Sequence, residues 1–137
     1  MIQREVALRI CAAAGTADYG AFTVLCQYFA DCELLYDVPP DCFYPMPKVT
    51  SSVIRMTVRE KPAVSDPELL FKIVRAAFAQ RRKTLQNALF TLFGKQKNKE
   101  ELKMILENCG FPADIRGERL SLTDFISLTE KIRETIA

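Results

Sequence analysis

The sequence predicts a mixed α and β protein in two parts, an α/β part over residues 1–60 and an all-helical part over residues 61–137. Apolar and polar side chains alternate with the two-residue period of a strand in residues 31–38 and again in residues 49–58. From residue 65 onward, apolar side chains instead recur every three or four positions, as in amphipathic helices. This change of period predicts the boundary between two domains.

Two helices are expected before the first strand. Ile2, Val6 and Ile10 are four positions apart, so residues 3–13 are predicted to form a helix that stops before Gly15. Residues 19–30 are predicted to form a second helix, with an apolar stripe that packs into the core. The stripe consists of Phe22, Leu25, Tyr28 and Phe29.

The two predicted strands form an antiparallel pair joined by a wide, proline-rich connection. In the first strand the alternation places Cys32, Leu34, Tyr36 and Val38 on one face, and Pro39-Pro40 ends it. Two strands with two helices leave sheet edges unpaired, so residues 1–60 look like the end of a larger α/β sheet. The exposed sheet surface predicts possible self-association of the chain.

Four helices are expected in the second part, and each has a recognisable end. Ser65-Asp66-Pro67-Glu68 has the spacing of a capping box, with proline tolerated in the first turn. The second helix covers residues 83–93 and stops at Gly94, and the third runs from a cap at Asn98 and Glu101 to Gly110. The last helix opens at Ser121. This is the pattern of a small helical domain.

Composition excludes several classes of function. The chain has no histidine, which removes the commonest general base and zinc ligand, so we expect no metal site, serine triad or cysteine–histidine pair. No apolar run is long enough for a membrane span and no signal peptide is recognisable, so we expect a cytoplasmic protein. The cysteines, which lack a C-x-x-C pair, are expected to be reduced and mostly buried: Cys11, Cys26, Cys32, Cys42 and Cys109.

Charge is unevenly distributed along the chain. Residues 1–60 hold 5 basic and 7 acidic side chains, whereas residues 61–137 hold 14 and 10. The span from Leu69 to Lys99 contains eight basic residues, Lys72 and Arg75 among them, and no acidic residue. A field of one sign along ordered structure favours contact with the phosphates of a nucleic acid.

The connection between the strands is the first informative motif. In Phe43-Tyr44-Pro45-Met46-Pro47 the prolines fix φ and restrict the residues before them, so the loop holds its aromatic side chains in place. Phe43 is either an aromatic ring presented to a ligand or a plug in the core.

The second motif is Arg81-Arg82-Lys83, predicted at a helix start, where the helix dipole opposes cations. This basic motif indicates either a phosphate site or a solvated basic turn. Asn87, one turn later, either holds a neighbouring loop or touches a nucleotide.

Together the two motifs resemble one family. Phe43-x-Pro-x-Pro-Lys-Val-x-Ser-x-Val-Ile-Arg55 and Phe78-x-x-Arg-Arg-Lys-Thr-Leu-x-Asn87 are similar to motifs of bacterial small-subunit ribosomal RNA adenine dimethyltransferases, the kasugamycin-resistance methyltransferases. The resemblance covers essentially the whole chain and matches the carboxy-terminal half of that family. It implies that residues 1–60 end a Rossmann-type catalytic domain and that residues 61–137 form a helical rRNA-docking domain.

The resemblance also implies an activity and its participants. The family uses S-adenosylmethionine to dimethylate two adjacent adenosines in a hairpin near the 3′ end of small-subunit rRNA. No glycine-rich cofactor loop, ribose-binding acid or Asn-Leu-Pro-Tyr element is recognisable here, so we expect this chain alone to lack cofactor binding and methyl transfer. The resemblance does not fully separate these enzymes from their erythromycin-resistance relatives, although Arg-Arg-Lys-Thr-Leu favours the former.

Residue roles follow from the resemblance position by position. Phe43 matches the aromatic residue that packs against the flipped target adenine, and flipping exposes an amine that is inaccessible in a stacked base. Lys48 and Arg55 match motif positions and either hold phosphates or brace the loop. The basic motif matches a contact surface for the ribosomal particle. The predicted RNA-binding set is Lys48, Arg55, Lys72, Arg75, Arg81, Arg82, Lys83 and Asn87.

Three functional hypotheses are open at this point. The chain is the substrate-docking half of an rRNA methyltransferase, a free-standing RNA-binding module without catalytic activity, or a soluble domain whose basic segment is only a solvated face and whose sheet edges drive dimerisation. The strand pair in residues 1–60 argues against the second hypothesis, because a free module has no need of part of a sheet.

Overall fold

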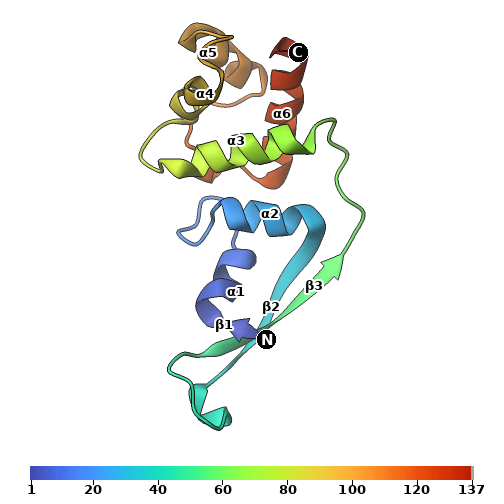
Figure 1. Cartoon of the computed structure of the whole chain (residues 1–137), viewed down its shortest axis with the longest axis vertical. Helices are drawn as coiled ribbons and strands as arrows, with labels where there is room; N and C mark the ends of the chain where they lie inside the picture. The colour runs from blue at the N-terminus through green and yellow to red at the C-terminus, as the bar shows by residue number, and fades with distance from the viewer. Residues whose placement is uncertain (137) are drawn as a thin grey trace. The chain divides into compact units, whose positions relative to one another are not determined.

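The computed structural model describes residues 1–136 and groups them into two compact units, Met1–Pro62 and a helical unit that begins at Ala63 (Figure 1). The first unit contains, in order, β1 (Ile2–Gln3), α1 (Arg4–Ile10), α2 (Ala21–Phe29), β2 (Ala30–Val38), the 3-10 turn η1 (Pro40–Cys42) and β3 (Ser51–Val58). The second contains α3 (Pro67–Ala79), α4 (Leu85–Phe93), α5 (Lys99–Asn108), the 3-10 turn η2 (Gly117–Arg119) and α6 (Leu122–Ile136).

The first unit is a three-stranded antiparallel sheet in the order β1-β3-β2, with α1 and α2 on one face (Figure 1). The predicted antiparallel pair is confirmed as β2 and β3. Ile2 and Gln3, expected to begin a helix, instead pair with Ser52 and Ser51, and α1 is correspondingly shorter than predicted. The hydrogen bond from the Arg4 backbone N–H to the Thr50 carbonyl, 2.9 Å long, holds the start of α1 beside β3.

The predicted alternation along β2 is wrong after Leu34. Leu34 pairs with Ile54 but Tyr36 pairs with the next residue, Val53, so one extra residue, Leu35, forms a β-bulge. Paired residues share a face of the sheet, and beyond the bulge Asp37 therefore lies on the face of Leu34. Tyr36 lies on the opposite face, where it is exposed.

The core-facing side of α2 also differs from the predicted stripe. Tyr28 is buried as expected, but Phe22, Leu25 and Phe29 are exposed. Polar contacts explain the difference: the buried Thr23 donates its hydroxyl to the Arg9 carbonyl at the end of α1. Gln27 donates to the carbonyls of Ile10 and Ala12, at 3.3 and 3.0 Å. These bonds satisfy carbonyl groups at the carboxyl end of α1 and place Thr23 and Gln27 on the side of α2 that faces it.

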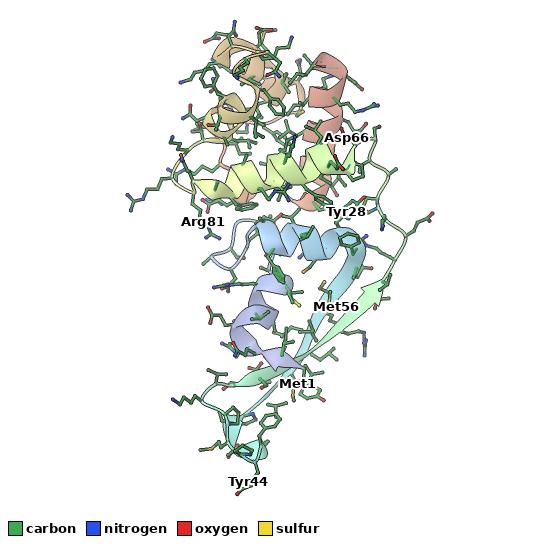
Figure 2. All side chains as sticks on the ribbon, viewed as in Figure 1. Met1, Tyr28, Tyr44, Met56, Asp66 and Arg81 are labelled. Carbon is green, nitrogen blue, oxygen red and sulfur yellow. The ribbon has the colours of Figure 1, made fainter. Side chains whose placement is uncertain are left out.

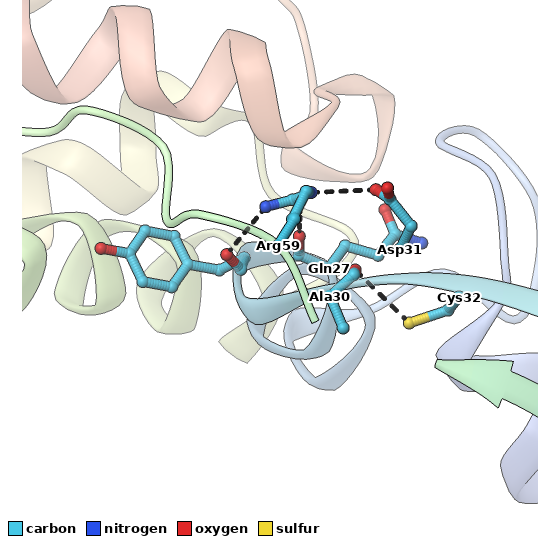
Figure 3. A network of polar contacts seen from close by, with 6 residues as sticks. Gln27, Ala30, Asp31, Cys32 and Arg59 are labelled. Atoms are coloured by element: carbon cyan, nitrogen blue, oxygen red, sulfur yellow. Dashed lines mark hydrogen bonds and ion pairs between the residues drawn. The ribbon is translucent and has the colours of Figure 1, made fainter. Parts of the chain in front are cut away.

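Arg59, just beyond β3, fastens the end of the strand pair to α2 (Figure 3). Its Nε donates to Asp31 Oδ1 at 2.9 Å, and its terminal nitrogens donate to the carbonyls of Tyr28 and Gln27. Those carbonyls are at the carboxyl end of α2, where a helix lacks internal donors and favours a cation. One arginine thus completes the helix end and neutralises a carboxylate.

The helical unit confirms the predicted all-helical second part. Its core is formed by apolar side chains on one face of each helix, including Leu70, Leu89, Leu102, Phe125 and Leu128. The capping box at Asn98 and Glu101 forms as predicted, and Gly110, with φ of 85°, follows the end of α5. Ser121 and Asp124 cap α6 through reciprocal hydrogen bonds.

The cap of α3 is one residue later than predicted. Asp66 accepts the backbone N–H of Leu69 at 3.1 Å, whereas Ser65 donates its backbone N–H and its hydroxyl to Glu130 of α6, each at 2.8 Å. These two bonds from Ser65 hold the pKa of the Glu130 carboxyl below its usual value. Ser65 therefore joins α6 to the beginning of the unit rather than capping a helix.

The cysteines are free thiols, as expected, but they are less buried than expected. Cys11, Cys26, Cys32 and Cys109 are half-buried, and Cys42 is exposed. Burial is the main cause that raises the pKa of each of the four half-buried thiols. These four side chains behave as small apolar groups at the margins of the core.

Candidate nucleic-acid interface

The aromatic loop, residues 39–50, projects from the end of the strand pair (Figure 2). Its first turn is closed by hydrogen bonds from the backbone N–H groups of Cys42 and Phe43 to the carbonyls of Pro39 and Pro40, both 3.2 Å. Phe43 is half-buried, whereas Tyr44 is fully exposed, at 101% of its reference area. The loop thus has one ring partly covered by protein and one ring in solvent.

A polar network fixes the base of the aromatic loop. Ser52 Oγ donates to Asp37 Oδ1 at 2.6 Å, and Arg4 Nε donates to Asp37 Oδ2 at 3.0 Å. The hydrogen bond from Ser52, followed by the contact with Arg4, holds the pKa of the Asp37 carboxyl below its usual value. Asp37 is two residues before the loop and Ser52 two residues after it, so the network ties the two ends of the loop to each other and to α1.

An open hollow lies against the aromatic loop. It is lined by Pro39, Pro40, Asp41, Met46, Pro47 and Lys48. Its walls are mainly apolar, and the exposed Lys48 is one of the residues that line it. Arg55, the other predicted contact in this unit, lies in the middle of β3 and forms an exposed ion pair with Glu33 of β2, at 3.5 Å. The structure therefore places Lys48 at the loop and Arg55 on the strand.

The basic turn, residues 80–84, joins α3 to α4. The sequence predicted its cations at a helix start, but α4 begins at Leu85 with Thr84 as its N-cap, so Arg81, Arg82 and Lys83 precede the helix. All three are exposed, and in Figure 2 the Arg81 label stands at this turn. The first turn of α4 holds no acidic residue. The turn therefore presents basic side chains beside the amino end of a helix, which is a favourable place for a phosphate.

Other predicted contacts in the helical unit flank the basic turn. Lys72 and Arg75 are exposed on α3, three residues apart and hence on the same side of the helix. Asn87 is half-buried in the first turn of α4, where its backbone N–H is bonded to Thr84 Oγ1 at 3.4 Å. A small cavity lined by Ala76, Ala79, Gln80, Lys83, Ala88 and Thr91 lies beside the turn.

The strands within residues 1–136 lack the kind of turn on which nucleotide-type cofactors usually sit. Nucleotide-type cofactors in α/β sheets sit on a glycine-rich turn directly after a strand. Here the glycines stand singly, and within residues 1–136 none of the three strands leads into a glycine-rich turn. The same residues contain no cluster of carboxylates and thiols suited to a metal ion. We also find no helix in the described part of the chain with the length and apolarity needed to cross a membrane.

Sequence reasoning missed two features of this interface. The bond between Asp37 and Ser52 depends on the bulge at Leu35, and no local pattern marks that extra residue. The full exposure of Tyr44 was also missed, although its position before Pro45 in a proline-rich loop is a signal for it. The spacing of Asp37 two residues before Pro39-Pro40 is a signal that could have indicated a fixed loop base.

Known proteins match this chain over nearly its whole length. The family model described as ribosomal RNA adenine dimethylase matches residues 1–127. The "Ribosomal RNA small subunit methyltransferase A" of Geobacillus thermodenitrificans is 45% identical over 136 residues, which is 96% of this chain and 46% of that protein. The protein of the same name from Chlamydia trachomatis is 41% identical and covers 98% of this chain and 48% of its own length.

Solved structures show the same fold. A dimethyladenosine transferase from Plasmodium falciparum superposes with a TM-score of 0.81 at 22% identity, covering 96% of this chain and 55% of that one. The 23S rRNA methyltransferase ErmE gives a TM-score of 0.63 at 21% identity, covering 96% and 52%. The chain spans about half the length of the curated relatives it matches. With its mixed α and β fold and its match over residues 1–127, the chain belongs to the ribosomal RNA adenine dimethylase family.

Proposed function

We propose that this chain is the substrate-docking half of an S-adenosylmethionine-dependent methyltransferase that dimethylates two adjacent adenosines near the 3′ end of small-subunit rRNA. The observation that carries the proposal is the aromatic loop, a stiff segment that bears the family's motif and is fixed at its base by Asp37, Ser52 and Arg4. Family membership supports it, because the matched relatives are named as rRNA small-subunit methyltransferases.

The two units have different roles in this proposal. Residues 1–60 supply the end of the catalytic α/β domain, where Phe43 stacks on the flipped target base and Lys48 and Arg55 contact phosphates or brace the loop. Residues 61–137 dock the rRNA or the small-subunit particle through Arg81, Arg82 and Lys83, with Lys72, Arg75 and Asn87 beside them. Because no glycine-rich cofactor loop is recognisable in the sequence, we expect the chain alone to bind RNA in the cytoplasm without transferring methyl groups.

The basic turn provides the first test. Binding of the chain to the small-subunit rRNA hairpin is measured over a range of salt concentrations, for the wild type and for a variant with Arg81, Arg82 and Lys83 changed to alanine. Each phosphate contact contributes about 0.7 to 0.9 to the slope of log affinity against log salt, so the slope falls by roughly 2 to 3 in the variant. A control with Lys103, Lys131 and Arg133 changed to alanine loses the same charge elsewhere in the unit. Equal slopes in all three proteins contradict the proposed docking surface.

A complementation experiment separates the docking half from a free-standing RNA-binding module. A separately made amino-terminal half of a relative is added to the chain, and methyl transfer to the rRNA is measured. Restored transfer, with turnover in Phe43→Ala reduced more than RNA affinity, supports the proposal. RNA binding without restored transfer favours the module. Self-association of the chain stays a prediction, and sedimentation velocity tests it directly.

A further inference from the structure

Tyr44 is the most exposed large apolar side chain among residues 1–136. Its neighbours Met46 and Val49 are exposed as well, so the tip of the aromatic loop presents a small apolar surface to solvent. In Figure 2 the labelled Tyr44 stands at the end of the loop, directed away from the sheet. Nothing about the packing of the first unit requires an aromatic residue there.

Tyr44 and Phe43 point in opposite directions. Phe43 has extended backbone angles, φ of −120° and ψ of 150°, and successive side chains of an extended segment lie on opposite sides. Phe43 is half-buried on its side and Tyr44 is fully exposed on the other. One base stacked on Phe43 therefore leaves Tyr44 for a different nucleotide.

The backbone that carries Tyr44 is held before any ligand arrives. Pro45 follows it directly, the turn before it is closed by the bond from the Phe43 N–H to the Pro40 carbonyl, and the loop base is fixed by Asp37. A ring on a fixed backbone loses little conformational entropy when it binds, and tyrosine has few rotatable bonds to immobilise.

The chemistry around the ring suits an unpaired nucleotide. A base gains stacking energy on an exposed aromatic face, and the hollow beside the loop offers apolar walls and a basic lining residue, Lys48, for a phosphate. We propose that Tyr44 stacks on a second, unpaired nucleotide of the RNA, flanking the base that Phe43 receives. The proposal rests on the proposed function, because it takes its RNA from there.

The absence of tryptophan from the chain allows a direct test. The Tyr44→Trp variant carries a single indole at the loop tip, and its emission is followed while the small-subunit rRNA hairpin is added. The matched control is Tyr36→Trp, because Tyr36 is also exposed, at 60%, but lies on β2 outside the loop. RNA binding by both variants is measured independently from the anisotropy of labelled RNA.

We expect saturable quenching in Tyr44→Trp and unchanged emission in Tyr36→Trp. In the same assay Tyr44→Ala binds the hairpin roughly fivefold to a hundredfold more weakly, from the known cost of losing one stacked base, and Tyr44→Phe restores the affinity. Normal RNA binding with unchanged emission in Tyr44→Trp overturns the role of Tyr44 and leaves the proposed function intact. No RNA binding by any variant contradicts both.

Discussion

The hydroxyl of Ser52 donates to the carboxylate of Asp37 at 2.6 Å across the β2–β3 pair, directly below the aromatic loop. Ser52 is fully buried and Asp37 is partly exposed, so the donor of this bond lies inside the protein and its acceptor is in contact with solvent. Arg4 donates a hydrogen bond to the second carboxylate oxygen of Asp37. A serine, an aspartate and an arginine from three different elements therefore set the position from which the loop departs.

Ser52→Ala tests this arrangement through the titration of Asp37. The Ser52 hydrogen bond is the main cause that lowers the pKa of Asp37 from its usual 3.8, so the pKa measured by NMR rises in the variant. A lowered pKa in the folded state stabilises the protein above the unfolded-state pKa, and this stabilisation is lost as the pH falls through the folded-state value. The stability difference between wild type and variant therefore shrinks below about pH 4. Ser51→Ala, on the other face of β3, is the control, and an equal pKa rise there contradicts the assignment.

Arg59→Ala is expected to destabilise the first unit by about 1.5 to 3 kcal/mol, since charged hydrogen bonds to two carbonyls and one carboxylate are lost. Arg55→Ala is the matched control: its side chain is 63% exposed, against 29% for Arg59, and it forms only an exposed ion pair with Glu33. We expect at most about 1 kcal/mol from that change. Urea denaturation measures both, and equal effects show that Arg59 has no special anchoring role.

Gly117→Ala is expected to destabilise the helical unit by about 1 to 3 kcal/mol through overpacking. A Cβ on Gly117 lies 2.6 Å from the Ala77 Cβ and 3.1 Å from the Ala77 carbonyl oxygen, so α3 and η2 must move apart. Ala79→Ser adds one atom at an exposed position near the end of the same helix and serves as the control. A thermal midpoint of Gly117→Ala as high as that of the wild type contradicts the close contact.

Alkylation of the thiols is expected to begin at Cys42. Cys42 is exposed on the aromatic loop, whereas burial shields the other four cysteines and raises their pKa values, which lowers the fraction of reactive thiolate at a given pH. Peptide mapping after brief treatment with iodoacetamide at about pH 8 identifies the order of reaction. The expected differences in alkylation rate depend on the folded structure, so the urea-unfolded chain is the control. In the unfolded chain we expect the five cysteines to react at similar rates. Faster labelling of Cys26 than of Cys42 in the folded chain contradicts this order.

Regular periodicity made much of the fold predictable. The helical unit follows from apolar residues at helical spacing and from caps such as Asn98 with Glu101, because both signals are local in the sequence. The antiparallel pair and its connection were predictable for the same reason. The aromatic loop was correctly placed between the two strands, since its prolines are visible without a structure, whereas the basic residues were predicted at a helix start and instead precede α4.

Features that depend on distant contacts were not predictable. Thr23 and Gln27 of α2 donate hydrogen bonds to the end of α1, between residues 14 to 17 positions apart, and the apolar stripe of α2 gives no indication of these contacts. The start of α4 is an exception, because its signal is local: Thr84, three residues before Asn87, caps the helix and accepts the N–H of Asn87. The anchoring of Arg59 joins residues about thirty positions apart, beyond the reach of any local pattern.

The bulge at Leu35 makes β2 unequally tolerant of length changes. The partners on either side of it, Leu34 with Ile54 and Tyr36 with Val53, are already consecutive on β3. A chain shortened by Leu35 alone keeps every partner and every face, including that of Asp37 opposite Ser52, and loses only the local twist. After a deletion elsewhere between Ala30 and Leu34, the strand pair cannot keep both the bulge and all of these partners. Natural variation in strand length within this segment is therefore expected at residue 35, because a change there leaves the direction of the aromatic loop unaltered.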